Sequence, residues 1–211
     1  MAASTKWNIA LAMALQIAAL PAVHASNFAV TGTISVNGNP GVLPAGGTFG
    51  DSGYNGATGA LSSGQFIFPV ATTTFHSDSL GADVTVTYQL SQTNTSTGQV
   101  ASDGVAALTQ ASLKLQVLSA LVGGVIPIGV GTCIFQPIPV DLAGTGSAAG
   151  LDLSAAGFTI PTVAPTDCGG HGNEINGGVA GSNNSMQVQL AGDFTPPPAN
   201  DTIFVNGFDG T

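Results

Sequence analysis

The sequence predicts an exported all-β domain, an antiparallel β-sandwich of Ig-like or jelly-roll-like type closed by one disulfide. Three observations support this prediction: an apolar N-terminal segment, short runs that alternate apolar and polar residues between turn residues, and an isolated pair of cysteines. Alternation with a period of two is typical of a strand with one buried face. Several such strands, separated by Gly, Asn, Asp, Ser and Pro, favour a sandwich.

The first segment has the organisation of a secretory signal peptide. Lys6 supplies a positive charge, residues 9–20 are apolar apart from one Gln, and Pro21 ends the run. Val23-His24-Ala25 places small or modest residues at the positions that signal peptidase reads, which predicts cleavage between Ala25 and Ser26. The run is shorter than the ~20 residues that span a bilayer, which argues against a membrane anchor. We therefore expect no membrane span after the signal peptide is removed.

The chain is poor in charge and acidic. It contains two basic residues, Lys6 and Lys114, against eleven carboxylates, all of which follow Ala25. The mature protein therefore has one lysine against eleven acids, a formal net charge of −10. Such a chain cannot neutralise phosphates, so nucleic acid is excluded as a partner. It also lacks a polybasic patch for anionic lipid.

Alternating runs predict the strands. The clearest lie at 28–36, 84–90, 113–117 and 186–190. Less regular candidates lie at 65–75, 98–108, 132–142 and 156–163. Beyond the signal, no segment has a helical period with caps, so we expect no helix.

Two cysteines remain in the mature chain, Cys133 and Cys168. In an exported protein an isolated pair forms a disulfide most simply. Neither C-x-x-C spacing nor neighbouring ligands support a redox or metal pair. Closing this loop is expected to stabilise the fold by ~3–4 kcal/mol.

Two stretches need separate interpretation. Residues 115–140 carry no charge, but their glycines and prolines argue against a membrane helix and favour edge strand or buried loop tied down by Cys133. Residues 37–64 are rich in Gly, Ser, Asn and Ala, which favours a long surface connection over a binding loop.

The predicted organisation has four parts. They are a signal peptide over 1–25, a β-sandwich domain over 26–194, a Pro-rich spacer over 195–199 and a C-terminal tail over 200–211.

No residue pattern predicts catalysis, and we assign no catalytic residue, metal ligand or cofactor. His76-Ser77-Asp78 places an imidazole beside an acid, but neighbours on a strand point to opposite faces. Asp167, His171 and Glu174 form the densest polar cluster, which is interpreted as a Gly-rich turn after the disulfide. Their spacing matches no known metal motif, and the sequence leaves open whether this turn binds a metal.

Two resemblances add to these inferences. Cys133, Gly144-Thr145, Cys168-Gly169 and the run from Asn183 to Met186 stand in an order that resembles a group of uncharacterised secreted bacterial β domains. That resemblance implies a fold but no activity. Residues 203–209, Ile-Phe-Val-Asn-Gly-Phe-Asp, resemble an I-F-x-x-G-F-[D/E] tail that ends many exported proteins of Gram-negative bacteria. This tail implies an address or a surface-attachment signal, with localisation outside the cell via the periplasm.

Three functions follow as hypotheses. The first is a secreted or cell-surface structural or interaction protein without catalysis, with self-association or a cell-surface partner. The second is a pilus-like or matrix subunit that assembles by strand pairing, with residues 28–36 as the donated strand. The third is a secreted hydrolase with a scattered active site. The ligand, the partner and the oligomeric state are not encoded in any motif.

Overall fold

The computed structural model describes residues 26–77, 80–128 and 133–199. The predicted signal peptide, with Ala25 of its cleavage site, and the tail over 200–211 lie outside these residues. The elements are β1 (Ser26–Val36), β2 (Asn39–Val42), β3 (Gly47–Ser52), β4 (Tyr54–Asn55), β5 (Ala60–Ile67), β6 (Ala71–Ser77), β7 (Ala82–Gln92), β8 (Ser96–Val100), β9 (Val105–Val122), β10 (Ile126–Ile128), β11 (Ile134–Ser147), β12 (Gly150–Ile160), η1 (Cys168–Gly170), α1 (Gly172–Val179) and β13 (Gly181–Leu190). The all-β prediction is confirmed.

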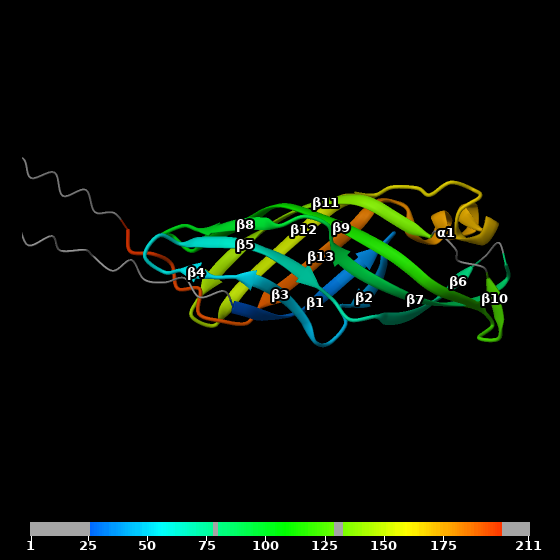
Figure 1. The fold of residues 1–211 in the computed structure, drawn as a ribbon, viewed down its shortest axis with the longest axis horizontal. Coiled ribbons are helices and arrows are strands. Elements are labelled where there is room, and N and C mark those ends of the chain that lie inside the picture. The colour runs from blue at the N-terminus through cyan, green and yellow to red at the C-terminus, as the bar shows by residue number, and fades with distance from the viewer. Residues whose placement is uncertain (1–25, 78–79, 129–132, 200–211) are drawn as a thin grey trace, which may run out of the picture.

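The sheet closes on itself as an eight-stranded antiparallel barrel (Figure 1). Its strands follow the order β9-β11-β12-β13-β1-β3-β5-β7, and pairing of β7 with β9 completes the ring. The last contact before closure is short, a single pair between Ile67 of β5 and Ser91 of β7. Strand β8 fills the wall beside it by pairing with both β5 and β9.

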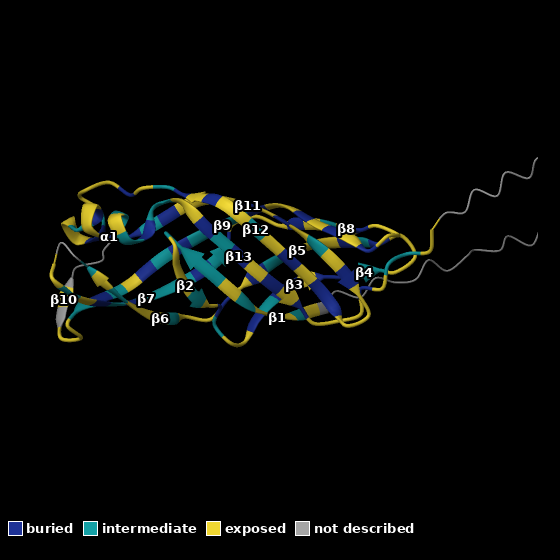
Figure 2. Cartoon of the chain, turned by 180° about the vertical axis from the view of Figure 1, so that it is seen from behind, coloured by how far each residue is buried: buried dark blue, intermediate teal, exposed yellow. Residues whose placement is uncertain are grey.

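The predicted β-sandwich is therefore wrong in its architecture. Alternation along β7, where Val84, Val86 and Leu90 are buried between half-exposed neighbours, shows only that one face of the strand is covered. A sandwich and a barrel both produce that pattern, because each buries one face of every strand. Figure 2 shows buried and exposed residues alternating along the strands in this view of the barrel.

The clearest strand predictions are confirmed as β1, β7, part of β9 and β13. Two weaker candidates each overlap two strands: 65–75 includes the end of β5 and the start of β6, and 98–108 includes the end of β8 and the start of β9. Prolines lie where the ladder tolerates them. Among the described strands, β10 with Pro127 pairs only with β9, and Pro137 lies in a bulge between the pairs made by Phe135 and Ile138.

Two expectations about connections are corrected. Residues 37–64 contain β2, β3, β4 and the start of β5 instead of one long surface loop. This Gly-rich stretch has low strand propensity, and β2, β3 and β4 are stabilised by pairing with β1 and β5. The region after Cys168, expected to be a turn without helix, includes the two-turn helix α1.

The predicted disulfide is confirmed: Cys133 and Cys168 are bonded, and both are fully buried. It joins the chain just before β11 to η1, and so holds the segment that leads into α1. In Figure 1, α1 lies at one end of the barrel, and the described chain begins and ends at the other.

Aromatic rings fill the half of the barrel away from α1, which we call the packed half. Phe49 and Phe66 are cross-strand partners with ring centroids 4.8 Å apart, and Phe68 stacks on Phe66 at 5.9 Å. Phe194 is fully buried against Phe28. In the described part of the chain, no helix is long and apolar enough to span a membrane.

Candidate functional site

The half of the barrel nearest α1 is hollow. A cavity of about 650 Å³ lies there, of the size that small-molecule sites have in proteins. Apolar side chains on the inner faces of five barrel strands line it: Ile34, Val36, Val86, Leu90, Leu113, Leu115, Val117, Ile138, Phe158 and Ile160. We call this space the barrel cavity.

The contrast between the two halves follows from side-chain size. An eight-stranded barrel is just wide enough for side chains to fill it or for one small ligand to occupy it. Phenylalanine rings fill the packed half, whereas valine, leucine and isoleucine dominate the cavity wall. Gln92 lies at the boundary: it follows the cavity residue Leu90 by two positions, and its Oε1 accepts a hydrogen bond from Phe66 N at 3.0 Å.

The barrel cavity has a side opening between two edge strands. Among the described strands, β2 pairs only with β1, and β6 pairs only with β7. Both also line the cavity, β2 through Asn39, Pro40 and Gly41, and β6 through residues 73–77. The cavity is therefore bordered on this side by β2 and β6, and we call this border the β2–β6 opening.

Helix α1 covers the end of the cavity next to this opening. Gly177, Gly178 and Val179 line the cavity from the helix. Asn37 Nδ2 donates a hydrogen bond to Gly177 O at 3.0 Å, which attaches the helix to the end of β1. Asn176 donates to Val163 O and accepts from Val163 N, both at 2.9 Å. These side-chain bonds hold a helix whose own sequence, with three glycines and two asparagines, has little helical propensity.

Tyr88 places a hydroxyl group on the apolar wall. Its position on β7 between the inward-facing Val86 and Leu90 turns the ring towards the core, where it is half-buried. Burial raises the pKa of the Tyr88 phenol above 10.0, because the phenolate loses hydration. Among the described residues its hydroxyl makes no hydrogen bond, although a tyrosine in apolar surroundings usually finds a partner.

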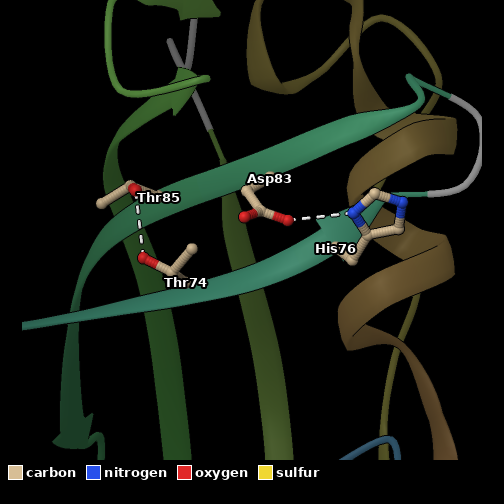
Figure 3. A network of polar contacts seen from close by, with 4 residues as sticks. All are labelled: Thr74, His76, Asp83 and Thr85. Carbon is tan, nitrogen blue, oxygen red and sulfur yellow. Dashed lines mark hydrogen bonds and ion pairs between the residues drawn. The ribbon is translucent and has the colours of Figure 1, made fainter.

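The charged groups near the cavity belong to its rim. Glu174 lies on the exposed side of α1. His76 lies on the outer face of β6, where its Nδ1 is 2.9 Å from Asp83 Oδ1 on β7, with both side chains more than half exposed. Figure 3 shows this pair beside the hydrogen bond between the hydroxyls of Thr74 and Thr85, at 3.0 Å. His76 thus has its carboxylate partner across the hairpin, while Asp78 lies outside the described residues.

The polar cluster after the disulfide forms a local turn. Asp167 Oδ2 accepts a hydrogen bond from Ala164 N at 3.0 Å, and His171 precedes the first residue of α1. Within residues 26–77, 80–128 and 133–199, no three His, Cys, Asp or Glu side chains are grouped so that they could hold a metal ion. The geometry at Asp167 fits the turn interpretation.

Comparisons with protein-family models, with curated proteins and with solved structures give no match for this chain.

The cavity residues were not identified as a site from the sequence. Val84, Val86, Tyr88 and Leu90 were correctly predicted to share one buried face, and Leu113, Leu115 and Val117 likewise. Burial in a filled core and burial around a cavity leave the same alternation, so the pattern could not distinguish them. The one sequence signal was Tyr88, a polar group on an otherwise aliphatic face.

Proposed function

We propose that this chain is an exported binding protein without catalysis, which holds a small apolar molecule in the barrel cavity. The observation that supports this function is the contrast between the two halves of one barrel. Phenylalanine rings pack together in the packed half, whereas the other half contains about 650 Å³ of space within walls that are mostly apolar. Water that enters through the opening wets this apolar wall, and a bound apolar molecule would cover the wall and displace that water.

The inner wall supports binding without catalysis. Acid–base catalysis needs a group that exchanges protons near neutral pH. Among the described residues, the inward-facing wall offers Tyr88, phenylalanine and aliphatic side chains, and the ionisable His76 and Glu174 stand at the rim. The strand proposed as a pilus-type donor, residues 28–36, is β1 and pairs with β13 on one side and with β2 and β3 on the other. This pairing favours a monomeric binding role over strand donation.

The signal-like segment over 1–25 and the tail over 200–211 support the proposed location, outside the cell after passage through the periplasm. The tail would attach the protein at the surface, so that the barrel presents its cavity there.

A fluorescent probe tests the binding function. N-phenyl-1-naphthylamine is neutral and apolar, and its emission rises when it leaves water. We expect saturable binding of one probe per chain. The double variant Val86→Trp with Val117→Trp fills the cavity from β7 and β9, and should weaken probe binding by about tenfold or more.

The control places the same two rings on the outside of the barrel. Gln89 and Gln116 are direct partners on the same two strands, on the outward faces, so Gln89→Trp with Gln116→Trp leaves the cavity unchanged. Probe affinity should be preserved in that variant. Absence of probe binding in the native protein, or equal affinity in both double variants, would contradict the proposed function.

A further inference from the structure

We infer that the ligand of the barrel cavity is a neutral, elongated apolar molecule with one hydroxyl or carbonyl group, which hydrogen-bonds Tyr88, and that carboxylates are excluded. This inference rests on the proposed binding function and specifies its ligand.

The described residues that line the cavity include no permanent cation that could pair with an anion. Neither lysine nor arginine lines the cavity, and Lys114 is on the outward face of β9 between the inward-facing Leu113 and Leu115. A carboxylate moved from water into such a wall would lose its hydration without a compensating ion pair. The cavity therefore opposes any ligand that must bury a negative charge.

Negative charge at the rim and over the whole protein also disfavours anionic ligands. Glu174 contributes a negative charge at the cavity border. The chain as a whole has a formal net charge of −9 at pH 7. This field lowers the local concentration of anions around the opening. Among the cavity-lining residues, His76 is the one side chain that can become cationic, and its Nδ1 is engaged by Asp83.

Tyr88 explains why the inferred ligand has one polar group. Tyr88 lines the cavity between Val86 and Leu90 of β7 and opposite Val117 of β9, and its hydroxyl makes no hydrogen bond to any described residue. A hydroxyl can donate to a carbonyl or hydroxyl oxygen, and can also accept from a hydroxyl. A ligand with one such group satisfies Tyr88 without bringing a charge into the wall, which is the arrangement of few polar groups on apolar walls that small-molecule sites use.

The shape and size of the ligand follow from the space. A cavity of ~150 Å³ takes up one benzene ring, so about 650 Å³ has room for roughly four ring-sized groups or about 20 to 25 non-hydrogen atoms. The space runs from the β2–β6 opening at Pro40 and Gly41 to Leu113 and Ile138 inside the barrel. An elongated molecule can enter through that opening while β1, β7 and the disulfide stay in place.

Displacement of N-phenyl-1-naphthylamine by two molecules with the same chain tests the ligand class. At about pH 8 dodecanoate is ionised, whereas 1-dodecanol is neutral. We expect 1-dodecanol to displace the probe at a concentration at least about tenfold lower than dodecanoate. Equal displacement, stronger displacement by dodecanoate, or displacement by neither would overturn the inferred ligand class. Failure of the probe itself to bind would instead remove the proposed function.

Two tyrosine variants test the role of Tyr88. Tyr88→Phe should weaken the binding of 1-dodecanol by about two- to tenfold, as expected for the loss of one hydrogen bond. Tyr54→Phe is the matched control, because the Tyr54 hydroxyl donates to Thr195 O at 2.6 Å, away from the cavity. An unchanged affinity for 1-dodecanol in Tyr88→Phe, or an equal loss in Tyr54→Phe, would overturn the role of Tyr88.

Discussion

Gly178 of α1 lies directly against the ring of Phe75 on β6. A Cβ atom added at position 178 would be 3.1 Å from Phe75 Cε2 and 3.2 Å from Cζ, whereas one added at Gly177 would meet no atom within 4 Å. Both glycines also line the cavity. The close approach at Gly178 therefore determines how near the helix comes to β6, beside the β2–β6 opening.

The two neighbouring glycines should respond differently to alanine. Gly177→Ala is expected to raise the free energy of unfolding by about 0.5–1 kcal/mol, since alanine restricts the unfolded chain and favours helix. In Gly178→Ala the contact with Phe75 should cancel this gain, leaving it at least ~0.5 kcal/mol less stable than Gly177→Ala. Urea denaturation measures both values. Equal stabilisation by both substitutions would contradict the packing of α1 on Phe75. We also expect the fluorescent probe to dissociate faster from Gly178→Ala.

Helix α1 also shows why part of the fold escaped prediction from the sequence. Its segment contains Gly172, Asn173, Asn176, Gly177 and Gly178, residues that disfavour an isolated helix. The helix is held by contacts that are distant in sequence: the bonds from Asn37 and to Val163, and the packing on Phe75. Local propensity carries no information about such contacts, so the segment was interpreted as a turn.

The strands were more predictable than their arrangement. Residues 28–36 and 84–90 alternate because one face of β1 and one face of β7 are buried, and this depends only on neighbouring positions. Closure of the barrel depends on β7 pairing with β9 from Val84 to Gln92, a long-range register that alternation does not specify. The cavity was hidden for the same reason, because Leu90 and Leu115 are buried whether the space before them is filled or empty.

Removing the disulfide should destabilise the protein substantially. Cys133 and Cys168 are 35 residues apart, and the cross-link reduces the entropy of the unfolded chain by about 3–4 kcal/mol on the loop-closure model. Because both cysteines are fully buried, alanine is the appropriate replacement. We expect Cys133→Ala with Cys168→Ala to lower the free energy of unfolding by that amount in urea. A change below ~1 kcal/mol would show that the chain around α1 is held by its other contacts alone.

The amide of Gln92 should be indispensable at the boundary between the two halves. Gln92 is 8% exposed; its Oε1 accepts from Phe66 N, and its Nε2 donates to Ser96 Oγ at 2.7 Å. Gln92→Leu leaves the Phe66 amide and the Ser96 hydroxyl without this partner, and each lost partner costs about 1–3 kcal/mol. We expect a total loss of roughly 2–4 kcal/mol in urea denaturation.

The outward-facing Gln89 on the same strand is the control for this substitution. Gln89→Leu should change stability by less than ~0.5 kcal/mol. Similar losses for Gln89→Leu and Gln92→Leu would mean that the amide network around Phe66 does not stabilise the barrel.

The titration of Tyr88 reports on the environment of its hydroxyl in the cavity. Residues 26–211 contain two tyrosines, so Tyr54→Phe leaves Tyr88 as the one phenol to follow by its ultraviolet absorbance. Because burial raises the pKa of Tyr88 above 10.0, its titration in the folded protein should lie above that of the unfolded chain. The folded state then holds the phenolic proton more tightly, so this contribution to stability is complete below about pH 10 and is lost as pH rises through the pKa of the folded state.

Saturation with 1-dodecanol should raise the pKa of Tyr88 further, since the alcohol displaces water from the ring and can accept its proton in a hydrogen bond. A titration near 10.0 that is unaffected by 1-dodecanol would place the Tyr88 hydroxyl in bulk water and remove it from the binding surface.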